Sequence, residues 1–180
     1  DFDPIKKRLA DTTFEGELEL NVGGVDVVVK DLGPAHTRRD AILWVPSDRV
    51  VYAADLLFVG GTPIAWDGPL ENWIAALDYI VSLDAKVVVP GHGPISGNAE
   101  VLAMRGYFEH VIEGATKAFN EGVPAIEAAR NFDLGKYGEL NEHGRVVQNF
   151  LNVYHHLGKP SNLNLLEVVT EVARIEGYGD

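Results

Sequence analysis

The sequence contains no cysteine and a single methionine, Met104, among its 180 residues. Without cysteine, the chain has no disulfide and no thiolate ligand for zinc, although this absence does not identify a cellular compartment. No apolar run approaches the length of a membrane span, and no signal peptide opens the chain, so we expect a cytoplasmic protein without a membrane partner. The chain begins at Asp1 rather than at a methionine, and we therefore expect a truncated or processed product.

Positive charge is also scarce. Fifteen Lys and Arg residues stand against 27 Asp and Glu residues, which gives a formal net charge of −12. The basic clusters are no longer than Lys6–Arg8 and the pair Arg38–Arg39. Because recognition of a polyanion depends on clustered Lys and Arg, the composition argues against a nucleic acid partner. A hydrophobic content of 46% over this length is sufficient for a domain with its own core.

Alternating apolar and polar residues predict antiparallel strands in the first third of the chain. Between residues 12 and 20, Phe14, Leu18 and Leu20 fall on one face and glutamates on the other, which is the period of a half-exposed strand. The turn residues 21–24 predict a hairpin with a returning strand over residues 25–32. Further strands are predicted at residues 41–45, 50–54 and 87–89. Strands in this order favour an α+β fold with a mainly antiparallel sheet flanked by helices.

Apolar residues at helical spacing predict helices between and after these strands. The expected helices cover residues 69–81, 101–119, 124–130, 145–157 and 163–175, with Trp73 and Phe150 as core residues. We accordingly divide the chain into residues 1–95, which hold the strands, and residues 96–180, a helical continuation and tail.

Three short signatures each place one potential metal ligand in or after a turn that follows an apolar run. They are Gly33–Asp40 (GPAHTRRD), Ala54–Phe58 (ADLLF) and Pro90–Pro94 (PGHGP). The ligands are His36, Asp55 and His92. Strand ends and the loops beyond them are where a rigid scaffold presents side chains to a ligand. Two imidazoles and one carboxylate form a set suited to zinc or iron.

Together, the three signatures resemble metal-ligand motifs of the C-terminal half of the metallo-β-lactamase-fold hydrolases, in that family's order. The resemblance covers roughly residues 12–94 and implies part of an αββα sandwich. It also implies two zinc positions, with iron possible, at which Asp55 is the bridging and catalytic carboxylate. His36 would then belong to one metal and His92 to the other. The family's His-x-His-x-Asp-His motif should lie upstream of His36, yet no histidine precedes that residue.

The resemblance further implies hydrolysis of a small-molecule ester, thioester, lactone, amide or phosphate ester by metal-activated water. Because the upstream ligands are missing, we expect the intact parent to be the enzyme and this chain alone to be inactive. We also expect a homo-oligomer, or association with the missing N-terminal half. Arg38 and Arg39 are candidates for contact with an anionic substrate.

Two other interpretations remain open. The chain is either a metal-free fragment or interaction module without catalysis, or it holds a single non-haem iron through His36, Asp55 and His92, since two histidines and one carboxylate form a known iron set. The remaining histidines are expected to be structural. His155 and His156 are adjacent, so on a helix they point about 100° apart and do not share a metal.

Overall fold

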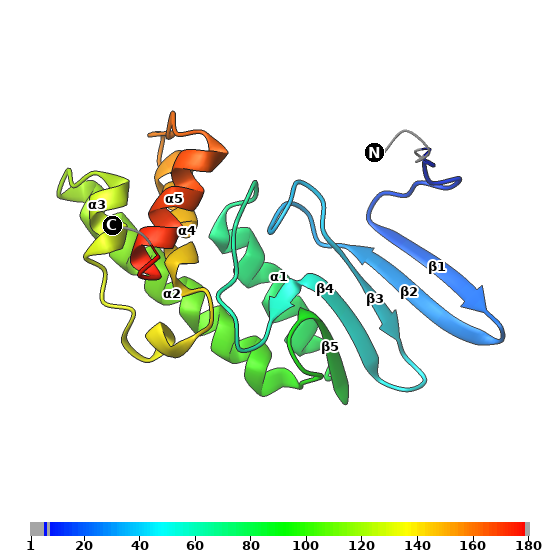
Figure 1. The fold of residues 1–180 in the computed structure, drawn as a ribbon. Helices are drawn as coiled ribbons and strands as arrows, with labels where there is room; N and C mark the ends of the chain where they lie inside the picture. The colour runs from blue at the N-terminus through cyan, green and yellow to red at the C-terminus, as the bar shows by residue number, and fades with distance from the viewer. Residues whose placement is uncertain (1–5, 7, 179–180) are drawn as a thin grey trace.

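The computed structural model describes residue 6 and residues 8–178. Five strands form one sheet in sequence order: β1 (Glu17–Val22), β2 (Val25–Asp31), β3 (Ala41–Val45), β4 (Val50–Phe58) and β5 (Val87–His92) (Figure 1). The pairs from β1 to β4 are antiparallel, whereas β5 runs parallel to β4 after a crossover through helix α1 (Leu70–Ser82). A mixed, mainly antiparallel sheet with flanking helices confirms the predicted α+β class.

The second half of the chain is helical, as predicted. It contains α2 (Asn98–Asn120), α3 (Ala125–Arg130), two short 3-10 turns (Gly135–Glu139 and His143–Arg145), α4 (Val146–His156) and α5 (Leu165–Ile175). Helix α2 runs from beside the sheet into a group with α3, α4 and α5 (Figure 1). Within the described residues, no helix is long and apolar enough to cross a membrane. The division of the chain at residue 95 stays a prediction.

Several strand boundaries differ from the prediction. Strand β1 begins at Glu17, so Phe14 lies outside it. Strand β4 continues to Phe58 instead of ending at Ala54, and β5 continues to His92. Both extensions follow from parallel pairing, which reaches Phe58 and His92 through an irregular register. Such pairing joins residues far apart in sequence, so no local pattern predicts it.

A two-residue turn sets the register of the first hairpin. Gly23 and Gly24 have φ angles of 61° and 91°. Left-handed backbone at both central positions belongs to the turn whose twist matches the flanking strands, and glycine adopts it without steric cost. The turn pairs Val22 with Val25 and places Leu18 opposite Val29.

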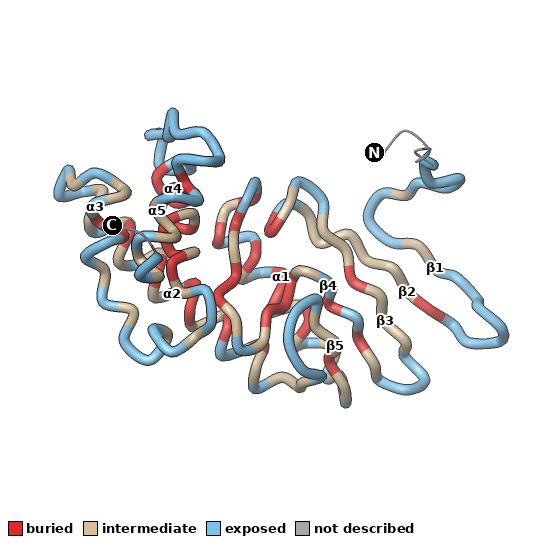
Figure 2. Tube along the Cα trace, viewed as in Figure 1, coloured by how far each residue is buried: buried red, intermediate tan, exposed pale blue. Residues whose placement is uncertain are grey.

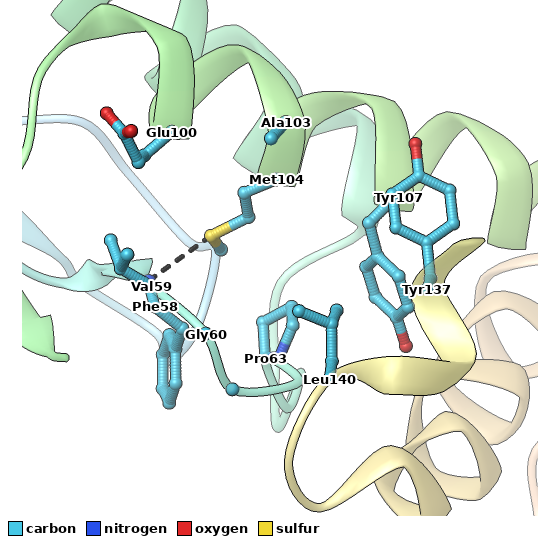
Figure 3. Close-up of a pocket in the computed structure, with 11 residues that line it drawn as sticks. Phe58, Val59, Gly60, Pro63, Glu100, Ala103, Met104, Tyr107, Tyr137 and Leu140 are labelled. Atoms are coloured by element: carbon cyan, nitrogen blue, oxygen red, sulfur yellow. Dashed lines mark hydrogen bonds between the residues drawn. The ribbon is translucent and has the colours of Figure 1, made fainter.

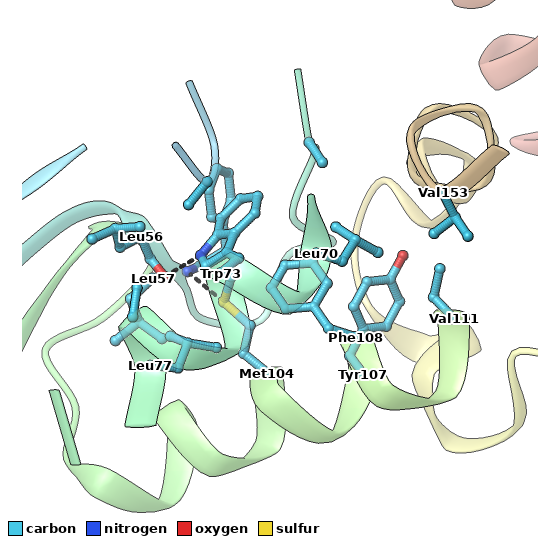
Figure 4. Packing of buried hydrophobic residues seen from close by; sticks show 14 of the residues in the cluster. Leu56, Leu57, Leu70, Trp73, Leu77, Met104, Tyr107, Phe108, Val111 and Val153 are labelled. Atoms are coloured by element: carbon cyan, nitrogen blue, oxygen red, sulfur yellow. Dashed lines mark hydrogen bonds between the residues drawn. The ribbon is translucent and has the colours of Figure 1, made fainter. Parts of the chain in front are cut away.

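The core lies on one face of the sheet. Ile42, Val51 and Val88 point from β3, β4 and β5 into a cluster with apolar residues of α1, α2 and α4. Trp73 of α1 is fully buried at its centre and donates its indole N–H to the Leu56 carbonyl (Figure 4). Its ring centroid lies 4.7 Å from that of Phe108, with the two rings tilted by 43°. Trp73 and Phe150 are both buried, as predicted.

The other face of the sheet is apolar but uncovered. The register places one row of side chains on it, which we call the open sheet face: Leu18, Leu20, Val22, Val25, Val27, Val29, Leu43, Val45, Val50, Tyr52, Val87 and Val89. None of them joins the core cluster, and Leu20, Val22 and Tyr52 are 42%, 62% and 47% exposed. The first hairpin is accordingly mostly exposed or half-buried along its length (Figure 2). No described element packs over this face.

Candidate functional site

The structure gathers the three predicted ligands around Asp55. His36 lies in the loop between β2 and β3, Asp55 within β4, and His92 at the end of β5. His36 Nε2 is 3.8 Å from one Asp55 carboxylate oxygen, and His92 Nε2 is 3.2 Å from the other. The His36 side chain is nearly buried, at 10% exposure, whereas those of Asp55 and His92 are about half exposed. Each imidazole therefore faces its own oxygen of a carboxylate that solvent can reach.

Hydrogen bonds fix both the loop and the ring of His36. The Asp40 carboxylate accepts the backbone N–H groups of Ala35 (3.1 Å) and Thr37 (2.9 Å), together with the Thr37 hydroxyl. The Nδ1 atom of His36 lies 2.7 Å from the Ile64 carbonyl oxygen. A carbonyl only accepts, so Nδ1 carries a hydrogen and Nε2 is the ring nitrogen that faces Asp55. Histidine ligands of metals commonly make this kind of supporting bond.

The backbone around Asp55 is irregular. Ala54 has a φ of 47°, which is uncommon for a residue with a side chain, and the β4–β5 register shifts on both sides of it. Strand β5 passes so close that a Cβ on Gly91 would lie 2.4 Å from Asp55 Oδ1. Only glycine permits that approach. Strain of this kind is typical of functional positions and here it sets the direction of the Asp55 side chain.

Phe58 supports both imidazoles. The His92 ring stacks on it at a centroid distance of 4.3 Å and an angle of 17°, and the His36 ring lies 5.7 Å away. The Val59 N–H donates to the His92 carbonyl at 2.9 Å. Phe58 is 5% exposed, so the rings rest against the rigid core rather than against a loop.

The donor set fits part of a cation site. The Nε2 atoms of His36 and His92 and the carboxylate oxygens of Asp55 are donors of the kinds that zinc and iron bind. Within residue 6 and residues 8–178, however, no group of three or more His, Asp or Glu side chains is arranged to hold a metal ion. A catalytic zinc generally takes three protein ligands and a water. The residues present therefore fit a portion of a metal centre and leave it short of ligands.

The other sequence candidates have partners within the chain. Arg38 pairs with Asp67 at 3.2 Å, and Arg39 pairs with Asp31 at 2.6 Å. The backbone N–H of Gly33 and the Arg39 guanidinium hold the pKa of Asp31 below its ordinary value. Both guanidinium groups are thus paired with carboxylates of the chain. A role for Arg38 and Arg39 in contacting an anionic substrate stays a prediction.

Two of the remaining histidines contact backbone carbonyls: His110 Nε2 lies 2.8 Å from the Asp133 oxygen, and His156 Nε2 lies 3.3 Å from that of Asp67. The ring planes of His155 and His156 meet at 87° with centroids 5.0 Å apart, and the expectation that the two do not share a metal stays a prediction.

Sequence reasoning missed the support of the site by helix α4. Asn149 and Asn152 are buried there and bind the backbone of the loop between β4 and α1. The signal was two asparagines inside the apolar run of a predicted core helix, since buried amides almost always have hydrogen-bond partners.

A small apolar cavity of about 100 Å³ adjoins the far side of the Phe58–Gly61 segment. Met104 and Tyr107 of α2 line it opposite Tyr137 and Leu140, and the Phe58 N–H faces the Met104 sulfur across 3.3 Å (Figure 3). It lies between β4 and the helices, so it belongs to the layer that supports the site.

A sequence profile described as the metallo-beta-lactamase superfamily matches residues 2–92, which is half of the chain. The chain belongs to that superfamily. Its members include hydrolases, and the predicted family resemblance is confirmed.

Curated relatives within this superfamily share parts of the chain. It is 34% identical over 85 residues to the 2,4-dinitroanisole O-demethylase subunit alpha of Nocardioides sp., covering 46% of this chain and 26% of that protein. It is 26% identical over 134 residues to a linear primary-alkylsulfatase of Pseudomonas sp., covering 68% of this chain and 25% of that protein. The chain thus spans about a quarter of the length of these relatives.

Solved structures share the fold over more of the chain. A stereoselective inverting sec-alkylsulfatase from Pseudomonas sp. matches 87% of this chain and 28% of its own, with a TM-score of 0.67 at 16% identity. A metallo-beta-lactamase family protein from Thermus thermophilus matches 81% of this chain and 49% of its own, with a TM-score of 0.60 at 18% identity. At these identities the likeness concerns the fold.

Proposed function

We propose that this chain is the C-terminal portion of a metal-dependent hydrolase in which His36, Asp55 and His92 are ligands. The observation that carries the proposal is the placement of one imidazole beside each oxygen of Asp55. In this placement Asp55 would serve two metal positions, one beside each imidazole. A single iron held by all three side chains is the alternative, and it would need them to converge on one point.

The residues divide the work as follows. His36, with its Nδ1–H held by Ile64, would offer Nε2 to one metal, and His92, stacked on Phe58, would offer Nε2 to the other. Asp55 contributes its negative charge to both. Metals held there would supply a water of lowered pKa and would polarise the substrate oxygen. The half-exposed Asp55 and His92 lie where a substrate can approach, whereas nearly buried His36 excludes water from its side.

The substrate class is an ester, thioester, lactone, amide or phosphate ester, and sulfate esters join this set. Among the curated relatives above, the alkylsulfatase shares the longer segment, 134 residues against 85. An alkyl sulfate is therefore a probe to include beside activated esters and lactones.

The functional protein also needs a cover for the open sheet face. Large contiguous apolar surfaces are rare on monomers, and this one extends across all five strands. We propose that a second copy of the chain or the remainder of a longer protein packs on it, and that the latter brings the missing ligands.

Metal analysis tests the proposal. Purified alone, the chain should carry well under one equivalent of zinc or iron, because too few ligands converge. Supplying an upstream half from a relative, fused or as a separate chain, should create two metal sites and hydrolysis. In that protein Asp55→Ala should lose both metals, whereas His36→Ala and His92→Ala should each lose mainly one. His155→Ala is the control and should leave metal content and rate nearly unchanged. If Asp55→Ala keeps both metals and full rate, the assignment of the three ligands is wrong.

A further inference from the structure

One polar face of helix α4 binds the backbone of the loop that joins β4 to α1. Gln148 donates its side-chain amide to the Ala65 carbonyl at 2.9 Å, and Asn152 donates to the Gly68 carbonyl at 3.0 Å. Just before the helix, the Arg145 guanidinium donates to the Thr62 carbonyl at 3.0 Å. Positions three or four residues apart share one helix face, so these side chains form a continuous row along the loop.

Asn149 lies in the centre of that row and is fully buried. Its Oδ1 accepts the Ala65 N–H at 3.0 Å, while its Nδ2 donates to the Pro63 carbonyl at 2.9 Å and to the Tyr107 hydroxyl at 2.8 Å. Both loop contacts flank Ile64, so this one amide fixes the peptide units on either side of that residue. With three bonds made, the amide has one orientation.

The opposite side of the same loop binds the His36 segment. The Ile64 carbonyl accepts His36 Nδ1–H, the Trp66 N–H donates to the His36 carbonyl at 3.0 Å, and the Gly68 N–H donates to the Ala35 carbonyl at 3.1 Å. At Gly68 a Cβ would fall 2.3 Å from Pro34, so the two backbones touch. The loop is a single layer between α4 and the ring of His36.

We infer that Asn149 is a positioning residue that sets the tautomer and direction of the His36 ring through Ile64. The inference rests on the proposed function only in treating His36 as a ligand. Its physical content is that the Ile64 carbonyl stays in line with Nδ1–H because Asn149 holds both neighbouring peptides. Without that hold, the carbonyl tilts away and the ring loses the bond that keeps the Nε2 lone pair toward Asp55.

The tautomer of His36 is measurable by nitrogen-15 NMR of the labelled 180-residue chain, with no metal added. Spectra are recorded at a pH of about 8, where the imidazole of free histidine is neutral. The parent chain should show His36 in the Nδ1–H form. Asn149→Ala should shift it to a mixture with the Nε2–H form that free histidine prefers.

Tyr154→Phe is the matched control, because it removes a hydrogen bond that another buried side chain of α4 donates to the Val123 carbonyl, away from the loop. It should leave the His36 tautomer unchanged. If Asn149→Ala does not fold, as judged by circular dichroism, Asn149→Asp decides, since it keeps the acceptor for Ala65 N–H but loses the donor to Pro63. An unchanged Nδ1–H signal in the folded Asn149 variant, or an equal shift in Tyr154→Phe, overturns the inference. Failure of the metal experiment leaves this readout intact, so the two proposals fail separately.

Discussion

Close backbone contact at Gly91 decides where the Asp55 carboxylate points. A Cβ there would lie 2.4 Å from Asp55 Oδ1 and 2.6 Å from the Ala54 carbonyl oxygen, well inside any ordinary contact. Ala54 itself is held in left-handed backbone. The position of Asp55 is therefore set by Ala54, whose backbone is strained, and by Gly91, where a larger side chain does not fit.

We expect Gly91→Ala to destabilise the chain by about 1–3 kcal/mol, the usual cost of overpacking a filled site. The added methyl group has to push β5 or the Asp55 side chain away. Denaturant unfolding measures the change. Gly61→Ala is the control, because its Cβ would meet nothing within 4 Å, and it should change the free energy of unfolding far less. Equal effects would show that the close contact is not rigid.

Acid sensitivity should arise partly at Asp31, which anchors the loop of His36 through the Gly33 N–H. Since the pKa of Asp31 is lowered in the folded chain, its contribution to stability is complete above the ordinary value of 3.8 and is lost as pH falls through the lower folded value. Asp31→Asn should therefore reduce the loss of stability on going from neutral pH to below 3.8. Urea unfolding across that range is the measurement. Asp48→Asn, on an exposed turn, controls for the loss of a charge. If the free energy of unfolding falls with pH equally in Asp31→Asn and the parent, the prediction is contradicted.

At the scale of elements, strand β4 is locked to helix α1 by one buried hydrogen bond. The Trp73 indole N–H donates to the Leu56 carbonyl at 2.9 Å, next to Asp55 in the strand. The irregular stretch of β4 lacks regular ladder partners, so this bond satisfies a carbonyl that the sheet does not.

Trp73→Phe should cost about 1–3 kcal/mol for the unsatisfied carbonyl, in addition to the cavity left by the smaller ring. Thermal or denaturant unfolding followed by circular dichroism measures it. Trp66→Phe makes the same chemical change at a position that is 43% exposed and should be nearly neutral. A Trp73→Phe chain as stable as the parent would mean that water satisfies the carbonyl instead.

At the scale of the whole molecule, the sheet has one covered and one open face. On β1 and β2 the polar side chains, including Glu17 and Lys30, lie on the side of the helices, and the apolar row lies on the other. Because large apolar patches are rare on the surfaces of monomers, this alternation indicates that another polypeptide segment or chain covers the apolar row.

We expect the purified chain to associate through the open sheet face. Sedimentation velocity should show an oligomer, and Leu20→Lys combined with Tyr52→Lys should shift it toward monomer by placing charges in the apolar contact. Glu19→Lys, on the opposite face of β1, should leave association unchanged. A clean monomer that binds no apolar dye would contradict the prediction.

The sequence by itself determined the local order of elements and the identity of the three candidate ligands. These local patterns are the period-two alternation, the Gly23–Gly24 turn and the helical spacing around Trp73. Each involves residues close together in sequence, so it can be recognised without knowing the fold. Proximity in three dimensions was not needed to select His36, Asp55 and His92, because each ends or follows an apolar run within a recognisable signature.

Only the tertiary structure decided how those ligands are held and which face of the sheet remains open. The length of β4 and β5 depends on pairing with each other, and the orientation of His36 depends on Asn149, 113 positions away in a helix of the tail. Such contacts join parts of the chain whose separation carries no local signal. Their hydrogen bonds and steric limits exist only after folding has brought the helix, the loop and the strand into contact.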